Sequence, residues 1–129
     1  MTDATRLPDA LVHKIGGLIL ADERVSARPW DGYALVVRYD QTGIQVSGFA
    51  YEQDQFRPVT PRSSALHQSL QALQVEMRQP GRNPWRACIV RIVRATKQIR
   101  IEFEYDHPER WDITPETLDA IAAQARPIA

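Results

Sequence analysis

The clearest pattern in the chain is a stripe of apolar residues at helical spacing, which predicts an amphipathic helix over Ser64–Gln79. The stripe consists of Leu66, Leu70, Leu73 and Met77. Ser63 or Ser64 is suited to cap the first turn through its hydroxyl oxygen. The segment Pro80–Pro84 ends the helix, because proline has no N–H to donate to a helical hydrogen bond.

A β-hairpin is predicted after this helix. Arg86–Val93 is rich in β-branched residues, and the chain turns at Arg94–Lys97. Gln98–Asp106 alternates between apolar and charged residues, as a strand with one buried face does. The apolar positions are Ile99, Ile101, Phe103 and Tyr105, and the charged positions are Arg100, Glu102, Glu104 and Asp106.

Another apolar stripe predicts a helix over Pro8–Ala21. Gly16 and Gly17 interrupt it, and each lowers helix stability by about 1 kcal/mol relative to alanine. They mark either the close approach of another element or a weak point in the helix. In the loop that follows, Trp30 is interpreted as a lid on the core rather than as a ligand platform.

A second hairpin is predicted between these two helices. Tyr33–Tyr39 and Ile44–Glu52 have the composition of strands, and the short turn between them ends at Gly43. Gly48 within the second strand predicts a bulge or a curved sheet. Residues 53–62 are polar and contain two prolines, so we expect an exposed connection there.

The C-terminal part predicts a loop over Asp106–Asp112 and then a helix. Thr114 followed by Pro115 is a typical helix start, and Pro127 ends the helix. Its apolar stripe consists of Leu118, Ile121, Ala122 and Ala125.

The predicted order of elements is therefore α-β-β-α-β-β-α. Short turns within each strand pair indicate antiparallel hairpins, so the expected fold is α+β, with a four-stranded antiparallel sheet and its helices packed on one face. No repeat or boundary divides the chain, which predicts a single domain over residues 1–129, with 1–7 and 127–129 as loose termini.

Composition narrows the classes of function. The 129 residues are 43% hydrophobic and 25% charged, with a formal net charge of zero, so bulk charge gives no support for binding nucleic acid or a membrane surface. No apolar run is long enough to span a bilayer, and the N-terminal residues do not have the pattern of a signal peptide. The one cysteine, Cys88, is interpreted as a buried apolar side chain. These features favour a cytoplasmic protein.

The sequence contains no recognisable constellation for chemistry. His13, His67 and His107 share no metal-ligand spacing, and one cysteine does not make a zinc cluster. Nucleotide-binding and metalloprotease motifs are absent from the sequence. We therefore expect no catalytic residues, no metal and no cofactor.

Charged residues are segregated by sign along the second half of the chain. From Arg78 to Arg100 every charged residue is basic, and from Glu102 to Asp119 all but Arg110 are acidic. Pairing between neighbouring strands of opposite charge explains part of this pattern, at roughly 0.2–1 kcal/mol per pair. The acids continue beyond the hairpin, however, and a rigid acidic surface attracts a basic partner.

The segment Leu66–Asp106 resembles the YezG-type bacterial immunity proteins. The resemblance rests on the order of three features: a helix with an apolar stripe, Asn83-Pro84-Trp85, and a hairpin that ends in the run Ile101–Asp106. It implies a non-enzymatic protein that binds and neutralises a cognate antibacterial toxin, often a nuclease, of a polymorphic or contact-dependent growth inhibition system. It also implies that Trp85, Phe103 and Tyr105 are structural.

Two hypotheses about binding follow. In the first, the cognate toxin, expected to be basic, contacts an acidic surface consisting of Glu102, Glu104, Asp106, Glu109 and Asp112. In the second, the protein is a small nucleic-acid-binding domain that contacts phosphates through the basic stretch Arg78–Arg100.

Overall fold

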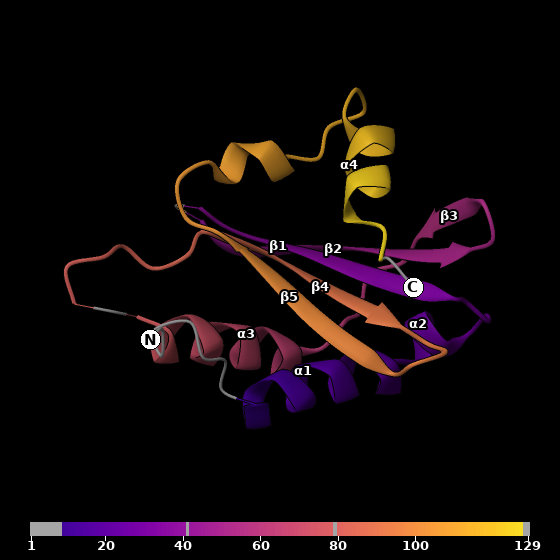
Figure 1. The fold of residues 1–129 in the computed structure, drawn as a ribbon, viewed down its shortest axis with the longest axis horizontal. Coiled ribbons are helices and arrows are strands. Elements are labelled where there is room, and N and C mark those ends of the chain that lie inside the picture. Colours follow the sequence, from indigo (N-terminus) through magenta and orange to yellow (C-terminus); the bar gives the residue numbers. More distant parts are fainter. Residues whose placement is uncertain (1–8, 41, 79, 128–129) are drawn as a thin grey trace.

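The computed structural model describes residues 9–40, 42–78 and 80–127, so the predicted loose terminus at 1–7 lies outside the described residues. One sheet of five strands forms the centre of the molecule (Figure 1). The strands are β1 (Gly32–Asp40), β2 (Gly43–Glu52), β3 (Gln55–Pro58), β4 (Ala87–Val93) and β5 (Gln98–Glu104). The helices are α1 (Asp9–Ala21), α2 (Glu23–Ser26), α3 (Ser64–Glu76) and α4 (Leu118–Ala125), with a 3-10 helix at Pro108–Trp111.

The sheet is antiparallel throughout, with the strand order β3-β2-β1-β4-β5. The α+β class and the antiparallel sheet are confirmed, and both predicted hairpins form. The prediction of four strands is wrong, because β3 pairs with the end of β2. Gln55–Pro58 lies in the segment expected to be an exposed connection. A strand of four residues that ends in proline has too short a pattern to stand out in the sequence.

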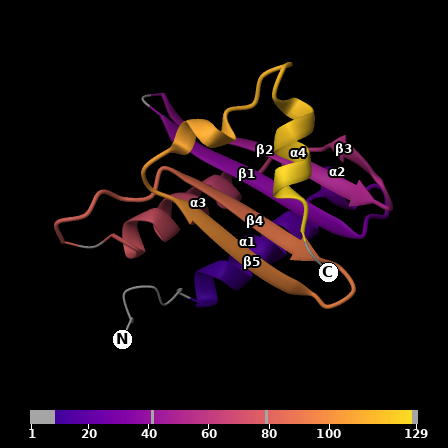
Figure 2. The same cartoon turned by 45° about the horizontal axis from the view of Figure 1, so that its top comes forward.

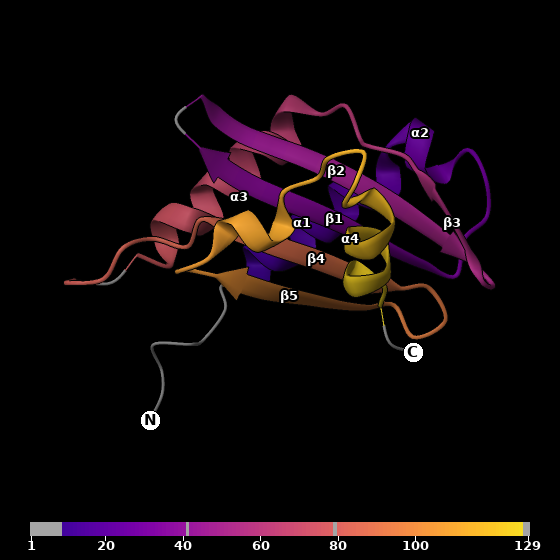
Figure 3. The same cartoon turned by 90° about the horizontal axis from the view of Figure 1, so that it is seen from above.

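Helices cover both faces of the sheet, so the prediction that they pack on one face is also wrong. The helices α1 and α3 lie side by side against one face, which we call the first face. The helix α4 and the 3-10 helix lie against the opposite, second face (Figure 2). Seen from above, α4 crosses the sheet while α1 and α3 lie beneath it (Figure 3).

The sequences of the two central strands, β1 and β4, indicate that both faces of the sheet are covered. Nearly all residues of β1 and β4 that lie in the middle of the sheet are buried, whichever face they point to. On β1, Leu35 belongs to the core of the first face and Val36 to the core of the second. A continuous apolar run is typical of a strand covered on both faces, whereas β5 alternates because its second face is more open.

Trp85 anchors the core of the first face. It is fully buried, with ring centroids 5.3 Å from Tyr39 and 5.5 Å from Phe103. Trp30 is buried as well, and its indole N–H donates to the carbonyl of Val25, which confirms its interpretation as a core residue. Cys88 is buried in the same core, and burial raises the pKa of its thiol.

The helix boundaries follow local capping. The Ser63 hydroxyl accepts a hydrogen bond from the Leu66 N–H, as predicted for the start of α3. The C-terminal helix starts at Leu118 rather than at Thr114, because the hydroxyls of Thr114 and Thr117 bond to each other and hold the preceding residues in a turn. Of the predicted loose terminus at 127–129, residues 128–129 lie outside the described residues, and Pro127 lies against Gly32.

The register between β1 and β2 runs without interruption through Gly48, which lies opposite Leu35. The expected bulge is therefore absent from this part of the sheet. A Cβ atom at Gly48 would lie 1.8 Å from the Tyr33 hydroxyl and 2.3 Å from the Val59 carbonyl oxygen. Glycine is required here because another part of the backbone crosses the strand at close range.

Candidate functional site

The second face leaves part of the sheet uncovered, and this region is the candidate site. The helix α4 and the 3-10 helix pack over β1 and β4 through Trp111, Ile121 and Ala122. The outward side chains of β5 are left beside the end of α4. The site therefore combines an edge strand, the last turn of a helix, and the acidic loop that leads from β5 to α4.

Arg91 on β4 fixes the end of α4. Its Nε donates to the Ala125 carbonyl at 2.9 Å, and its Nη2 donates to the Gln124 carbonyl at 3.1 Å. These carbonyls belong to the last turn of α4, where the helix dipole favours a cation. The third nitrogen of the guanidinium, Nη1, lies 2.7 Å from Glu102 Oε1 on β5. One side chain thus joins β4, β5 and α4.

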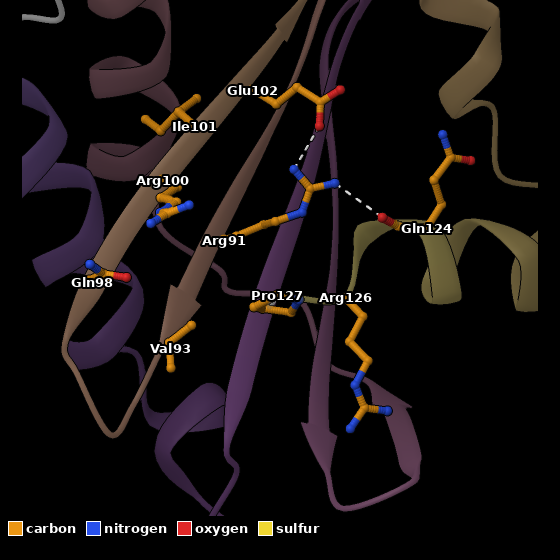
Figure 4. A pocket seen from close by; sticks show the side chains of 9 residues that line it. All are labelled: Arg91, Val93, Gln98, Arg100, Ile101, Glu102, Gln124, Arg126 and Pro127. Atoms are coloured by element: carbon orange, nitrogen blue, oxygen red, sulfur yellow. Dashed lines mark hydrogen bonds and ion pairs between the residues drawn. The ribbon is translucent and has the colours of Figure 1, made fainter. Parts of the chain in front are cut away.

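A groove of about 410 Å³ lies between β5 and the end of α4 (Figure 4). Its charged lining residues are Arg91, Arg100, Glu102 and Arg126. Arg91 and Glu102 neutralise each other, and the Arg126 guanidinium is directed away, donating to the Gln53 carbonyl beside the Tyr51 ring. Arg100 remains at the rim, exposed to solvent. Among the residues that the structure describes, the groove therefore offers one cation without a partner, Arg100, rather than a set of groups that converge on a ligand.

Three of the five acids in the predicted toxin-binding surface are engaged within the protein. Glu102 pairs with Arg91 at 2.7 Å, and Asp112 Oδ1 lies 2.6 Å from Arg38 Nη2 on β1. Glu104 is about four-fifths buried. It accepts hydrogen bonds from the N–H groups of Asp106 and His107, and its other oxygen lies 3.8 Å from Arg110 Nη1.

Asp106 and Glu109 are the remaining two acids, and both are exposed. Within the described residues, Asp106 has no side-chain partner, and Glu109 Oε2 contacts only the exposed His107 Nδ1, at 3.1 Å. A hydrogen bond from its own N–H, assisted by His107, holds the pKa of the Glu109 carboxyl below its usual value. Of the five predicted residues, Asp106 and Glu109 are thus the two that lack an arginine partner among the described residues.

The predicted basic stretch does not form one continuous surface. The Arg82 guanidinium lies over the Tyr105 ring, 3.8 Å from its centroid, and Arg94 lies 3.9 Å from that of Trp30. Arg91 points to the second face and is engaged by α4. In addition, Tyr33 on β1 is buried and Tyr39 on the same strand is partly buried against the core, so the central strands do not present an open aromatic face on which bases stack.

The described residues show no grouping of metal ligands. Within residues 9–40, 42–78 and 80–127, no group of three or more His, Cys, Asp or Glu residues is arranged so that it could hold a metal ion. In the same ranges, no helix has both the length and the apolar character needed to cross a bilayer.

Comparison of the chain with protein-family models and with curated proteins gives no match. The surfaces of this molecule and the sequence resemblance are therefore the guides to its function. The sequence indicated Glu102 as a site residue, but it did not indicate that Glu102 pairs with Arg91. Arg91 appears in the sequence only as one of several scattered arginines. Its central role becomes visible once α4 is placed on the second face.

Proposed function

We propose that this protein is an immunity protein that neutralises a cognate antibacterial toxin by non-catalytic association. The resemblance of Leu66–Asp106 to YezG-type immunity proteins motivates this proposal. The three aromatic residues of the matched segment support it, because Trp85, Phe103 and Tyr105 all pack onto the core of the first face. The matched motif therefore maintains the fold and leaves the outer surface free to differ with the toxin.

The main support for the proposed toxin-binding surface is the pair of exposed carboxylates at Asp106 and Glu109. They follow a strand that is paired along its full length with β4, so their backbone starts from a rigid support. The hydrogen bonds from the N–H groups of Asp106 and His107 to Glu104 fix the start of the loop. A preformed acidic loop attracts a basic partner and loses little conformational entropy on binding.

The test uses the toxin domain that, as the resemblance implies, is encoded beside the gene for this protein. Both proteins are produced together, co-purification is measured, and protection of growth is scored. We expect the double variant Asp106→Lys/Glu109→Lys to bind about tenfold more weakly or worse, because two attractions become repulsions. The difference in affinity between the double variant and the wild type should narrow as the salt concentration rises, because salt screens both the attraction and the repulsion.

A matched control is Asp54→Lys/Glu76→Lys, which makes the same charge change at exposed positions elsewhere. It should bind and protect as the wild type does. If neither the wild type nor the control binds the toxin domain or protects growth, the immunity function is refuted. If the double variant retains wild-type affinity while folded, the function stands and the acidic loop is not the contact surface.

A further inference from the structure

The strand β5 is an open edge of the sheet. It is last in the strand order, and no described element lies outside it (Figure 3). Every second residue of such a strand directs an unpaired N–H and C=O outward, which makes the edge a template for another strand. The opposite edge is protected against pairing with another strand, because β3 is short and ends at Pro58.

Arg100 on this edge is in an unfavourable position within one copy of the chain. The register between β4 and β5 places it directly opposite Arg91. Like charges at directly opposite positions destabilise a sheet. Arg91 is compensated by Glu102 and by the carbonyls of α4, whereas Arg100 has no ion-paired or hydrogen-bonded partner among the described residues.

We propose that β5 pairs antiparallel with β5 of a second copy of this chain, about a twofold axis at Ile101. In this register, Arg100 of each copy lies opposite Glu102 of the other, so two ion pairs form on the second face. Gln98 lies opposite Glu104 on the same face, so no like charges meet at that position. The unpaired charge of Arg100 thereby gains a partner that the single chain does not supply.

The first face is complementary in the same register. Ile99 lies opposite Phe103 of the second copy, and Ile101 lies opposite its own equivalent. All three side chains are only partly buried in the single chain, so pairing covers apolar surface that water now contacts. Directly opposite apolar pairs of this kind are stabilising.

The charge pattern selects this register over its neighbours. Moving the axis to Arg100 places Arg100 opposite Arg100. Moving it to Glu102 places Glu102 opposite Glu102, and it sets Arg100 opposite Glu104, a carboxylate that is already buried and engaged within its own chain. Both alternatives bring like charges together, which is unfavourable. The sequence of β5 is therefore complementary to itself in one antiparallel register, as an interface with twofold symmetry requires. The sheets of the two copies then join into one.

The inference does not depend on the proposed function, and its test needs only the purified protein. Mass is measured by sedimentation velocity over a range of concentrations. We expect the wild type to dimerise and Arg100→Glu to dissociate at least about tenfold more readily, because two attractive pairs become repulsive. The control Arg78→Glu makes the same change at an exposed residue beyond the end of α3 and should leave the dimer unchanged.

Two further variants test the register itself. In Arg100→Glu/Glu102→Arg the charges are exchanged, so the complementarity returns, and the new carboxylate lies opposite Arg91 and keeps it paired. This variant should dimerise as the wild type does. Glu102→Arg alone should be monomeric, yet mixing it with Arg100→Glu should give a heterodimer, since each then supplies the charge that the other lacks.

A wild type that is monomeric at all concentrations overturns the proposal, as does a folded Arg100→Glu variant that dimerises normally. If the charge-exchanged variant is folded by circular dichroism but stays monomeric, and the mixed variants do not associate, the register about Ile101 is wrong.

Discussion

Gly16 on α1 lies so close to Ile99 on β5 that a Cβ atom at Gly16 would come within 2.1 Å of Ile99 Cδ1. Gly16 is buried, whereas its neighbour Gly17 is exposed and has nothing within 4 Å of a Cβ. The two glycines that interrupt the helical pattern therefore have different causes. The first permits the contact of a helix with the edge strand, and the second has no packing role.

This difference predicts opposite effects for the same substitution. Gly17→Ala should stabilise the protein by about 0.5–1 kcal/mol, because alanine is the better helix former and meets no neighbour. Gly16→Ala should destabilise it by about 1 kcal/mol, since overpacking costs more than the gain in helix propensity. Urea denaturation of the two variants beside the wild type measures both free energies of unfolding.

A second substitution identifies the clash. Adding Ile99→Val to Gly16→Ala removes the methyl group that lies nearest to the new Cβ. The double variant should therefore be more stable than the sum of the two single effects, by about 0.5–1 kcal/mol. Strict additivity would show that the Ile99 contact is not the cause.

Arg91 is expected to hold α4 on the sheet. Arg91→Met keeps the apolar stem of the side chain but leaves two carbonyls of α4 and the Glu102 carboxylate without their donor. We expect a loss of about 2 kcal/mol in stability, and faster hydrogen exchange of the α4 amides than of the β1 amides. Arg91→Lys should recover little, because an ammonium does not span the three acceptors.

Arg86→Met is the matched control for this variant. The Arg86 side chain is exposed, and it makes no hydrogen bond or ion pair within the described residues. Its replacement should change stability by less than about 0.5 kcal/mol. Equal losses from the two variants would contradict the role given to Arg91.

The two hairpins and the central helix could be predicted because each depends on a local pattern. The alternation along Gln98–Glu104 and the apolar stripe of α3 repeat for long enough to specify the element type. The α2 helix and β3 were missed because four residues show no periodicity. One signal for α2 was present, since Asp22 is a good cap and accepts from the N–H groups of Arg24 and Val25.

The placement of helices on both faces was harder to predict, although the sequence carried a signal for it. The unbroken apolar runs of β1 and β4 indicate strands that are buried on both faces. The acidic surface was only partly predictable for a different reason. Whether a carboxylate is free depends on which arginine reaches it, and Arg38 and Arg91 reach Asp112 and Glu102 through the tertiary fold.

Buried tyrosines make the stability of the fold sensitive to alkaline pH. The Tyr51 hydroxyl donates to the Ala122 carbonyl at 2.6 Å, and burial raises the pKa of Tyr51 to about 12. Burial likewise raises the pKa of Tyr33, whose hydroxyl donates to the Val59 carbonyl at 2.7 Å. A phenolate has no proton to donate, so ionisation removes both contacts.

The direction in which pH changes the free energy of unfolding depends on whether the folded or the unfolded state loses its tyrosine protons first. Above pH about 10 the tyrosines of the unfolded chain ionise while those of the folded chain stay protonated. The unfolded state then binds fewer protons, so the free energy of unfolding falls as pH rises from about 10 through about 12. Below pH about 10 this contribution is fully present.

The variant Tyr51→Phe isolates one of these groups. At neutral pH it should lose about 1–2 kcal/mol, because the Ala122 carbonyl loses its donor. Above pH about 10 its difference from the wild type should shrink, since phenylalanine has no proton to lose. Val36→Ala, a variant in the same core without a titratable group, should differ from the wild type by a constant amount across this range. Urea denaturation at stepped pH measures both differences, and a constant difference for Tyr51→Phe would contradict the assignment.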